Sequence, residues 1–214
     1  EEYRYIKRPL INNAFGSNST PIPNANLIMV SSANPGEGKT FTAINLAMSM
    51  VLEQDRTVLL VDADVINPNI CERLGIDNKP GLMDYLRGKT TVSDIILNTN
   101  IPKLKIITAG KRFHHSNELL ASEKMSQFMH ELSTRYSDRI VIFDTSPLLG
   151  ASNTNVLAQL TGQAVIVVAQ EQTKQRNLDR ALAALNPNQA VGLVLNKNKS
   201  SRKEYYGYYY ADRK

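Results

Sequence analysis

Short runs of apolar residues recur along the chain, and each ends in small or polar residues. These runs lie at 27–30, 57–61, 105–108, 140–143, 164–169 and 191–195. Runs of this length that are rich in Val, Ile and Leu are typical of buried parallel strands. Helical segments are predicted between them, at 41–52, 116–136 and 174–185. The alternation predicts an α/β fold, a doubly wound and mostly parallel sheet with helices on both faces.

The remaining segments divide the chain into four predicted parts. A short helix over 1–8 should stop at Pro9, and the turn-forming residues that follow favour a linker. Short helices are also predicted at 82–87 and 92–97. We therefore expect an N-terminal helical part, a linker, one globular domain and a flexible tail, with bounds 1–15, 16–26, 27–198 and 199–214.

The residues after the first run have the chemistry of a phosphate-binding loop. Gly36 and Gly38 let the backbone curl, so that successive N–H groups can point at one anion. Lys39 can then reach the β- and γ-phosphates of a nucleotide, and the Thr40 hydroxyl can ligate Mg²⁺. The strict pattern requires glycine where this chain has Ala33. The alternative is a glycine turn with an incidental surface lysine.

Carboxylates follow two of the other predicted strands. Asp62 and Asp64 come after the second run, and Asp144 comes after the run at 140–143. Because the carboxyl ends of parallel strands meet at one edge, all three should lie near Lys39. An aspartate at the place of Asp144 typically holds Mg²⁺, directly or through water.

Composition narrows the classes of protein without deciding among them. The 214 residues suit one domain, and the net charge of +5 is modest. The single cysteine, Cys71, permits no internal disulfide, which suits a reducing cytoplasm. The three histidines lack zinc-ligand spacing, and no apolar run approaches the roughly 18 residues of a membrane span. Because the chain begins with Glu rather than Met, we expect it to be a fragment of a longer protein.

Five of the nine tyrosines are gathered near the C-terminus, beside basic residues. They are Tyr205, Tyr206, Tyr208, Tyr209 and Tyr210. Aromatic side chains mixed with basic ones can stack on single-stranded nucleic acid. The sharper interpretation is a cluster of phenols that accept a phosphoryl group.

Together these features resemble the bacterial tyrosine kinases, the autokinases that regulate export of capsular and extracellular polysaccharide. Residues 35–40 resemble that family's phosphate loop, which tolerates a non-glycine first position, and 58–64 and 140–147 resemble its two acidic motifs. Residues 3–9 and 62–65 are most similar to the subgroup associated with exosortase-type exopolysaccharide loci. The chain departs from the family at Ile66, where many members have Arg.

The resemblance implies a P-loop NTPase fold of the MinD/ParA type, with ATP and Mg²⁺ as cofactors. Phosphoryl transfer mostly needs positioning and charge neutralisation, which assigns Lys39, Asp62 and Asp64 as catalytic residues. Either Asp62 or Asp64 would orient the incoming tyrosine and deprotonate it. Thr40, Asp62 and Asp144 are the expected metal ligands. The expected nucleotide contacts are Pro35, Gly36, Glu37, Gly38, Lys39, Thr40, Phe41 and, for adenine by resemblance, Asn196.

The N-terminal charges suggest an interface. Glu1, Arg4 and Lys7 share one helical face without an obvious partner in the chain, so this is either a solvated face or a self-association surface. They resemble the family's oligomer motif, with Lys in place of the usual last Arg. The resemblance implies a ring in which subunits phosphorylate each other, a cognate tyrosine phosphatase, and no nucleic acid. It also implies activation by the cytoplasmic segment of a membrane-spanning polysaccharide co-polymerase, which places the kinase at the inner face of the plasma membrane.

The partition and septum-site ATPases are the nearest rival family. They share the fold and carry lysine at the position of Asn34, within a Lys-Gly-Gly start to the loop. This chain has Asn34, Pro35 and Gly36 there. That difference and the tyrosine cluster favour the kinase interpretation, whereas the rival predicts ATP hydrolysis without phosphotyrosine.

Overall fold

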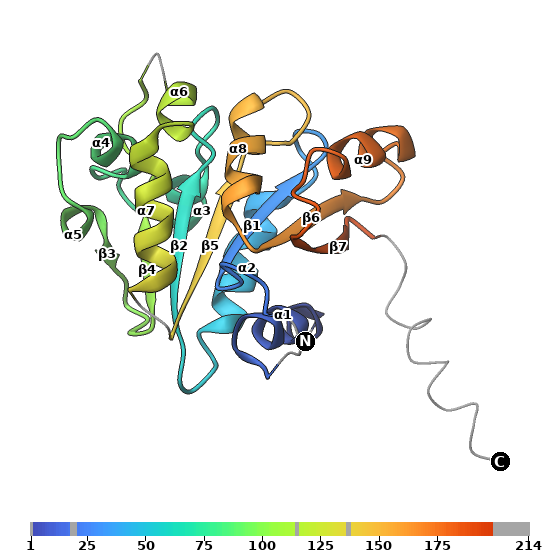
Figure 1. Ribbon diagram of the computed structural model, residues 1–214, viewed down its shortest axis with the longest axis horizontal. Coiled ribbons are helices and arrows are strands. Elements are labelled where there is room, and N and C mark those ends of the chain that lie inside the picture. Colours follow the sequence, from blue (N-terminus) through green and yellow to red (C-terminus); the bar gives the residue numbers. More distant parts are fainter. Residues whose placement is uncertain (1, 18–20, 114–115, 136–137, 199–214) are drawn as a thin grey trace.

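The computed structural model describes residues 2–17, 21–113, 116–135 and 138–198. Seven strands form one sheet in the order β3-β4-β2-β5-β1-β6-β7, and every neighbouring pair is parallel except β3 with β4 (Figure 1). The strands are β1 (Leu27–Ser32), β2 (Thr57–Ala63), β3 (Leu97–Asn98), β4 (Leu104–Ile107), β5 (Arg139–Thr145), β6 (Gln163–Ala169) and β7 (Ala190–Asn196). The predicted mostly parallel sheet is confirmed.

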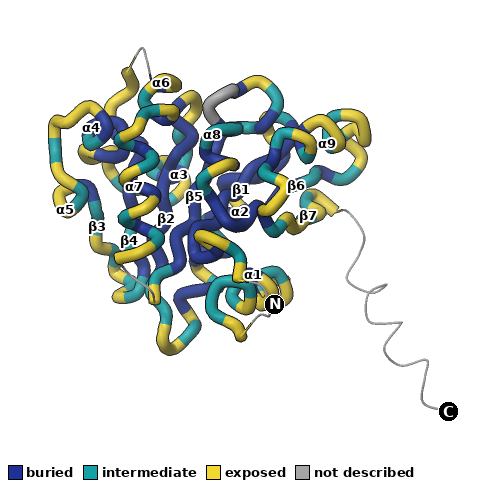
Figure 2. The backbone as a smooth tube through the Cα atoms, viewed as in Figure 1, coloured by how far each residue is buried: buried dark blue, intermediate teal, exposed yellow. Residues whose placement is uncertain are grey.

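Helices cover both faces of this sheet. They are α1 (Glu2–Phe15), α2 (Lys39–Met50), α3 (Ile70–Leu74), α4 (Leu82–Leu86), α5 (Val92–Ile95), α6 (Ser116–Leu120), α7 (Glu123–Thr134), α8 (Ser152–Leu160) and α9 (Gln175–Leu182). Alternate residues of a strand point to opposite faces. Ile28 and Val30 of β1 therefore pack with α1 and α2, while Leu27 packs with α4 to α8 and Met29 with α8 and α9. Figure 2 shows the central strands as the most buried part of the chain.

The last strand corrects a prediction. The run at 191–195 was expected to be buried, but Val191, Leu193 and Leu195 are 45%, 55% and 58% exposed. β7 is an edge strand that pairs only with β6, and these alternate residues share one face of it, which is left open to solvent. An apolar run identifies a strand here without identifying its place in the sheet.

The first helix also differs from its prediction. Pro9 does not stop α1, which continues to Phe15. A proline inside a helix removes the hydrogen bond to the carbonyl four residues earlier, here that of Tyr5. Both Pro9 and Tyr5 are exposed, so water can solvate that carbonyl. Beyond the proline, Leu10 is buried against α2, and this packing keeps the second half helical.

Several shorter elements were misjudged or missed. The single helix predicted at 116–136 is two helices, because Ser122 caps α7 by accepting a hydrogen bond from the backbone N–H of Met125 at 3.3 Å. The helix predicted at 92–97 ends at Ile95 and leads into β3. The helices α3 and α8 were not predicted at all. A helix of five residues, such as α3, is too short to show a periodic pattern.

The predicted domain boundaries remain predictions. Residues 21–26, in the expected linker, form turns whose side chains reach the main domain, as where Asn26 donates to the carbonyl of Ser133 at 3.3 Å. Glu1 and the tail at 199–214 lie outside the described residues. Among the residues that are described, no helix is long and apolar enough to cross a bilayer.

Candidate functional site

The loop between β1 and α2 has the backbone shape that an anion-binding loop needs. Gly36 and Gly38 have φ angles of 78° and 102°, in the region that favours glycine. A Cβ at Gly38 would also lie 2.0 Å from Nδ2 of Asn196. Ala33 has no positive φ and its side chain is buried, so the loop does not require glycine at that position.

Glu37 holds this loop from inside. Its carboxylate is 2% exposed and accepts hydrogen bonds from the backbone N–H of Asn34 at 3.0 Å, from Nδ2 of Asn34 at 2.8 Å and from Oγ1 of Thr173 at 2.6 Å. Nδ2 of Asn177 in turn donates to Oδ1 of Asn34 at 2.9 Å. The predicted nucleotide contact of Glu37 stays a prediction for its backbone N–H, since its side chain is engaged within the loop. Sequence reasoning missed Thr173 and Asn177, because no motif marks them.

The lysine of the loop forms a buried ion pair. Nζ of Lys39 lies 2.5 Å from Oδ2 of Asp64, and both side chains are almost fully buried. The other oxygen, Oδ1 of Asp64, accepts from the backbone N–H of Asn67 at 3.0 Å and from Oγ of Ser146 at 2.6 Å. The dipole of α2 disfavours a cation in its first turn, and Asp64 offsets that effect. Ser146 was not predicted, although it follows Asp144 by only two residues.

Two further carboxylates lie beside this pair on adjacent strands. Asp62 and Asp144 are opposite one another in β2 and β5, and both are 0% exposed. Oδ2 of Asp62 accepts from the backbone N–H of Ile70 at 3.1 Å. Within the described part of the chain, Oδ1 of Asp62 and both carboxylate oxygens of Asp144 have no hydrogen-bond partner. Buried polar atoms without partners are costly and rare, so these three oxygens point to a ligand.

Burial changes the protonation of these two groups. Burial, reinforced by the charge of Asp144, raises the pKa of the Asp62 carboxyl to about 7. Burial also raises the pKa of Asp144 to about 6, against the opposing charge of Lys39. A cation among them would favour the ionised forms.

The donor set fits Mg²⁺ bound together with a nucleotide. Mg²⁺ prefers oxygen ligands, and the carboxylate of Asp144 lies beside the buried hydroxyl of Thr40. No three His, Cys, Asp or Glu side chains in the described ranges could form a metal cluster by themselves. That is compatible with Mg²⁺, which usually combines one or two carboxylates with phosphate oxygens and water.

The other predicted contacts lie around the loop or outside the described residues. Pro35 and Phe41 are exposed on either side of the buried loop residues. Nδ2 of Asn196 donates to the backbone carbonyl of Glu37 at 2.9 Å, so β7 ends against the loop. The five clustered tyrosines and Glu1 lie outside the described part of the chain.

Lys7 corrects a further expectation. The sequence showed no obvious partner for it in its own chain, yet the residue is buried. Its Nζ donates to the carbonyl of Ser49 at 2.9 Å and lies 2.5 Å from Oε1 of Glu53. Arg4, one turn earlier, is exposed. The interface prediction itself is not tested by one copy of the chain.

Comparison with known proteins identifies the family of this chain. A model for an AAA domain matches residues 25–188. The tyrosine-protein kinase YwqD of Bacillus subtilis (strain 168) is 32% identical over 184 residues, which cover 85% of this chain and 76% of the relative. This chain belongs to the bacterial tyrosine-protein kinases. The tyrosine-protein kinase wzc of Salmonella typhimurium is 29% identical over 86% of this chain, but the match spans only 26% of wzc.

Solved structures extend the likeness to the three-dimensional level. The kinase domain of the Escherichia coli tyrosine kinase ETK gives a TM-score of 0.76 at 26% identity, covering 93% of this chain and 77% of that one. The chimerical protein CapA2B2 gives 0.80 at 25% identity, covering 92% and 84%. The septum-site protein MinD of Pyrococcus horikoshii, complexed with Mg-ADP, gives 0.66 at 23% identity, covering 83% and 72%, and shares the fold. Membership of the exosortase-associated subgroup remains a prediction.

Proposed function

We propose that this chain is an ATP-dependent protein-tyrosine autokinase whose acceptors are the tyrosines of its C-terminal cluster. The observation that supports this best is the buried group of Lys39, Asp62, Asp64 and Asp144 at one edge of the sheet. Its three carboxylate oxygens without partners are costly for an isolated fold and useful for binding Mg·ATP.

The loop and its lysine would bind the nucleotide. Backbone N–H groups of 36–40 cradle the phosphates, as at other helix N-termini. Lys39 would exchange Asp64 for the β- and γ-phosphates, where it offsets developing negative charge. Thr40 and Asp144 would hold Mg²⁺, which neutralises phosphate charge when bound. Asn196, already against the loop, is the proposed adenine contact.

The acceptor side of the reaction needs a group that orients a phenol and takes its proton. A free tyrosine has a pKa near 10, so a nearby carboxylate assists its attack. In this structure Asp64 already accepts hydrogen bonds from Lys39, Asn67 and Ser146. Asp62 has a free oxygen and a pKa of about 7, which favours Asp62 for this role.

Assembly and partners follow from the sequence resemblance. We propose a ring in which one subunit phosphorylates the tail of the next, assembled through the N-terminal face that carries Arg4. The proposed activator is the cytoplasmic segment of a membrane-spanning polysaccharide co-polymerase, which would hold the kinase at the inner face of the plasma membrane. A tyrosine phosphatase would reset the system, and no nucleic acid takes part. The proposed output is control of exopolysaccharide or capsule synthesis and export.

A MinD/ParA-type ATPase switch without kinase activity is the second candidate, favoured by the shared fold. Mass spectrometry after incubation with Mg·ATP separates the two. Phosphate on the peptide beyond Lys203 is the result expected of the autokinase. Release of ADP and inorganic phosphate, with no phosphotyrosine in that peptide, would overturn it in favour of the ATPase. Light scattering of the same samples tests the ring, which we expect to dissociate as the phosphorylated tails are repelled by the acidic site.

A further inference from the structure

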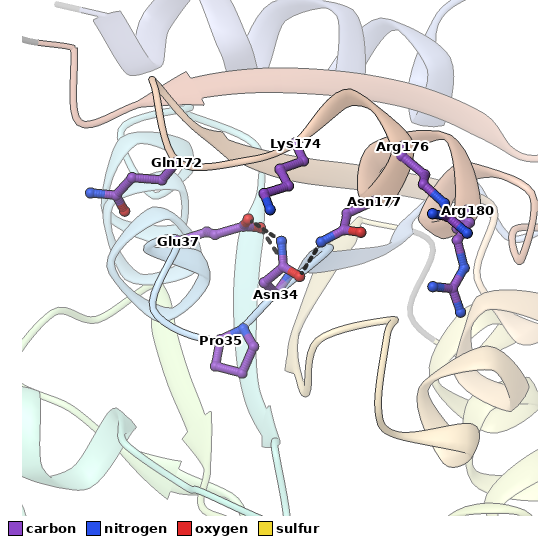
Figure 3. A pocket seen from close by; sticks show the side chains of 8 residues that line it. All are labelled: Asn34, Pro35, Glu37, Gln172, Lys174, Arg176, Asn177 and Arg180. Atoms are coloured by element: carbon purple, nitrogen blue, oxygen red, sulfur yellow. Dashed lines mark hydrogen bonds between the residues drawn. The ribbon is translucent and has the colours of Figure 1, made fainter.

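A basic pocket of about 520 Å³ lies on the outer side of the phosphate loop. Asn34 and Glu37 form one wall, and the segment from Gln172 to Arg180 forms the other (Figure 3). The lining includes neither Lys39 nor any of the three aspartates of the candidate site. Figure 3 shows Lys174 near Asn34 and Glu37, while Arg176 and Arg180 lie together on the far side.

The three cations that line this pocket have no ion pair with a described residue. They are Lys174, Arg176 and Arg180, and all three are exposed. Arg176 and Arg180 are four residues apart on α9, where like charges repel each other. The one carboxylate in the lining, Glu37, is buried and engaged with Asn34 and Thr173. An anion would relieve this repulsion.

The chain passes the edge of this pocket on its way into the tyrosine cluster. Nζ of Lys197 donates to Oε1 of Gln172 at 2.9 Å, and Gln172 lines the pocket. Asn198 is the last described residue, and Tyr205 follows seven residues later. Seven extended residues reach at most about 25 Å, so the nearest clustered tyrosine can return to the pocket of its own subunit.

We propose that this pocket binds phosphotyrosine of the same chain's C-terminal cluster, a proposal that rests on the proposed function. From Lys197 onward the chain carries six basic and two acidic residues, so its unmodified form is repelled by the pocket. Each phosphate adds about −1.5 to −2 charges, and arginine side chains bind phosphate oxygens in pairs. The acidic catalytic edge repels the product while the basic pocket retains it. Asn34 and Glu37 belong both to the pocket and to the loop proposed to bind ATP. A phosphorylated tail bound in the pocket would therefore contact the loop that holds the nucleotide.

The first test uses a synthetic probe, so that it does not depend on kinase activity. A fluorescent peptide of residues 199–214, phosphorylated at Tyr205 and Tyr208, is titrated with the full chain carrying Phe at its five clustered tyrosines. We expect it to bind at least about tenfold tighter than the unphosphorylated peptide, and Arg176→Gln with Arg180→Gln to remove about that factor. The matched control, Lys79→Gln with Lys89→Gln, removes the same charge elsewhere and should bind as before. An equal loss of affinity for the phosphorylated peptide in both double variants, or no loss in either, would contradict the assignment of the pocket as the phosphotyrosine site.

The second test asks whether the tail binds its own subunit. The full chain with a phosphorylated tail, prepared by its own activity or by ligation of the synthetic segment, should bind the probe about tenfold more weakly than the phenylalanine chain. A tethered ligand competes at high effective concentration, so dilution should not change this result. Probe binding as tight as that of the phenylalanine chain would overturn the intramolecular assignment. A chain that binds the probe but never phosphorylates itself would refute the proposed function and leave the pocket intact.

Discussion

A buried lysine lies at each end of helix α2, one from α2 itself and one from α1. The helix dipole acts on the two charges in opposite directions. At its start, Lys39 pairs with Asp64 among carboxylates that lack partners. Near its end, Lys7 of α1 binds the carbonyl of Ser49 and pairs with Glu53. Helix dipoles favour cations at C-termini and disfavour them at N-termini. The dipole of α2 therefore favours Lys7 where it lies, whereas it disfavours Lys39, whose charge depends on Asp64 for compensation.

The two lysines also differ in what surrounds them. Around Lys39, three carboxylate oxygens are buried without hydrogen bonds, an arrangement that a ligand would stabilise. The ammonium group of Lys7, by contrast, has both a carbonyl and a carboxylate of its own chain as partners. The sequence predicted a nucleotide site at Lys39 and suggested an interface at Lys7. Both roles stay predictions, and what the structure adds is the difference in their contacts.

The largest expected effect is at Lys39. Lys39→Met removes the cation that would offset charge on the β/γ phosphates, so we expect the rate of phosphoryl transfer to fall by about a hundredfold or more. The thermal midpoint without nucleotide should also fall, because the variant leaves the buried carboxylate of Asp64 without its cation, although Asn67 and Ser146 still donate to it. The measurement is the initial rate of phosphate incorporation beside a calorimetric melt. A variant with wild-type rate would remove Lys39 from the mechanism.

The next largest effect is the pH dependence of the unfolding free energy, to which Asp144 contributes. The pKa of Asp144 is raised to about 6 in the folded chain, so at low pH the proton that it binds stabilises the folded state. This contribution is fully present below the unfolded value near 4 and is lost as the pH rises through 6. Asp144→Asn should therefore gain about 1 to 2 kcal/mol relative to wild type between pH 5 and pH 7.5, without metal or nucleotide.

Chemical denaturation in a chelating buffer measures this gain in unfolding free energy. A second series of the same measurement is made with Mg·ATP present. Mg·ATP should stabilise wild type at pH 7.5 and have much less effect on Asp144→Asn. Parallel stability curves for the two proteins across this pH range would show that Asp144 is not held in the protonation state described here.

A smaller effect is expected at the other end of α2. Lys7→Met keeps most of the aliphatic side chain but loses the bond to Ser49 and the pair with Glu53. The expected cost is about 1 kcal/mol of unfolding free energy, with no change in ATP affinity. Isothermal titration beside denaturation tests both statements. If Lys7→Met weakened ATP binding and left the unfolding free energy unchanged, the assignment of Lys7 to stability rather than to nucleotide binding would be wrong.

The smallest effect on stability is expected at Arg4, which is exposed. Arg4→Ala should change unfolding free energy by less than about 0.5 kcal/mol. If its face joins subunits, the same variant should lower the mass measured by light scattering of the unphosphorylated protein. An unchanged mass from an oligomeric wild type would place the interface elsewhere.

The central sheet and the meeting of the three aspartates at one of its edges were predictable, because both depend on local sequence. A buried parallel strand reads as an apolar run, and its carboxyl end fixes where Asp62, Asp64 and Asp144 meet. The phosphate loop has its own spacing of Gly36, Gly38 and Lys39. These features need no knowledge of distant contacts.

The features that sequence could not supply all depend on distant contacts. Thr173 is 136 residues from Glu37, and their hydrogen bond leaves no trace in a local pattern. The exposure of Leu193 depends on the position of β7 at the edge of the sheet. The continuation of α1 past Pro9 depends on packing against α2. The intrachain partners of Lys7 were likewise invisible, because Ser49 lies 42 residues away.

A mixing experiment joins the site around Lys39 to its proposed acceptor. A Lys39→Met chain with an intact tail is combined with an otherwise wild-type chain whose five clustered tyrosines are Phe. The intact mass of each chain is measured by mass spectrometry after incubation with Mg·ATP. We predict phosphotyrosine on the Lys39→Met chain in the mixture and none when that chain is incubated alone. Phosphate on the Lys39→Met chain alone, or no phosphate in the mixture while wild type modifies itself, would contradict transfer from the Lys39 site to the tail of another subunit.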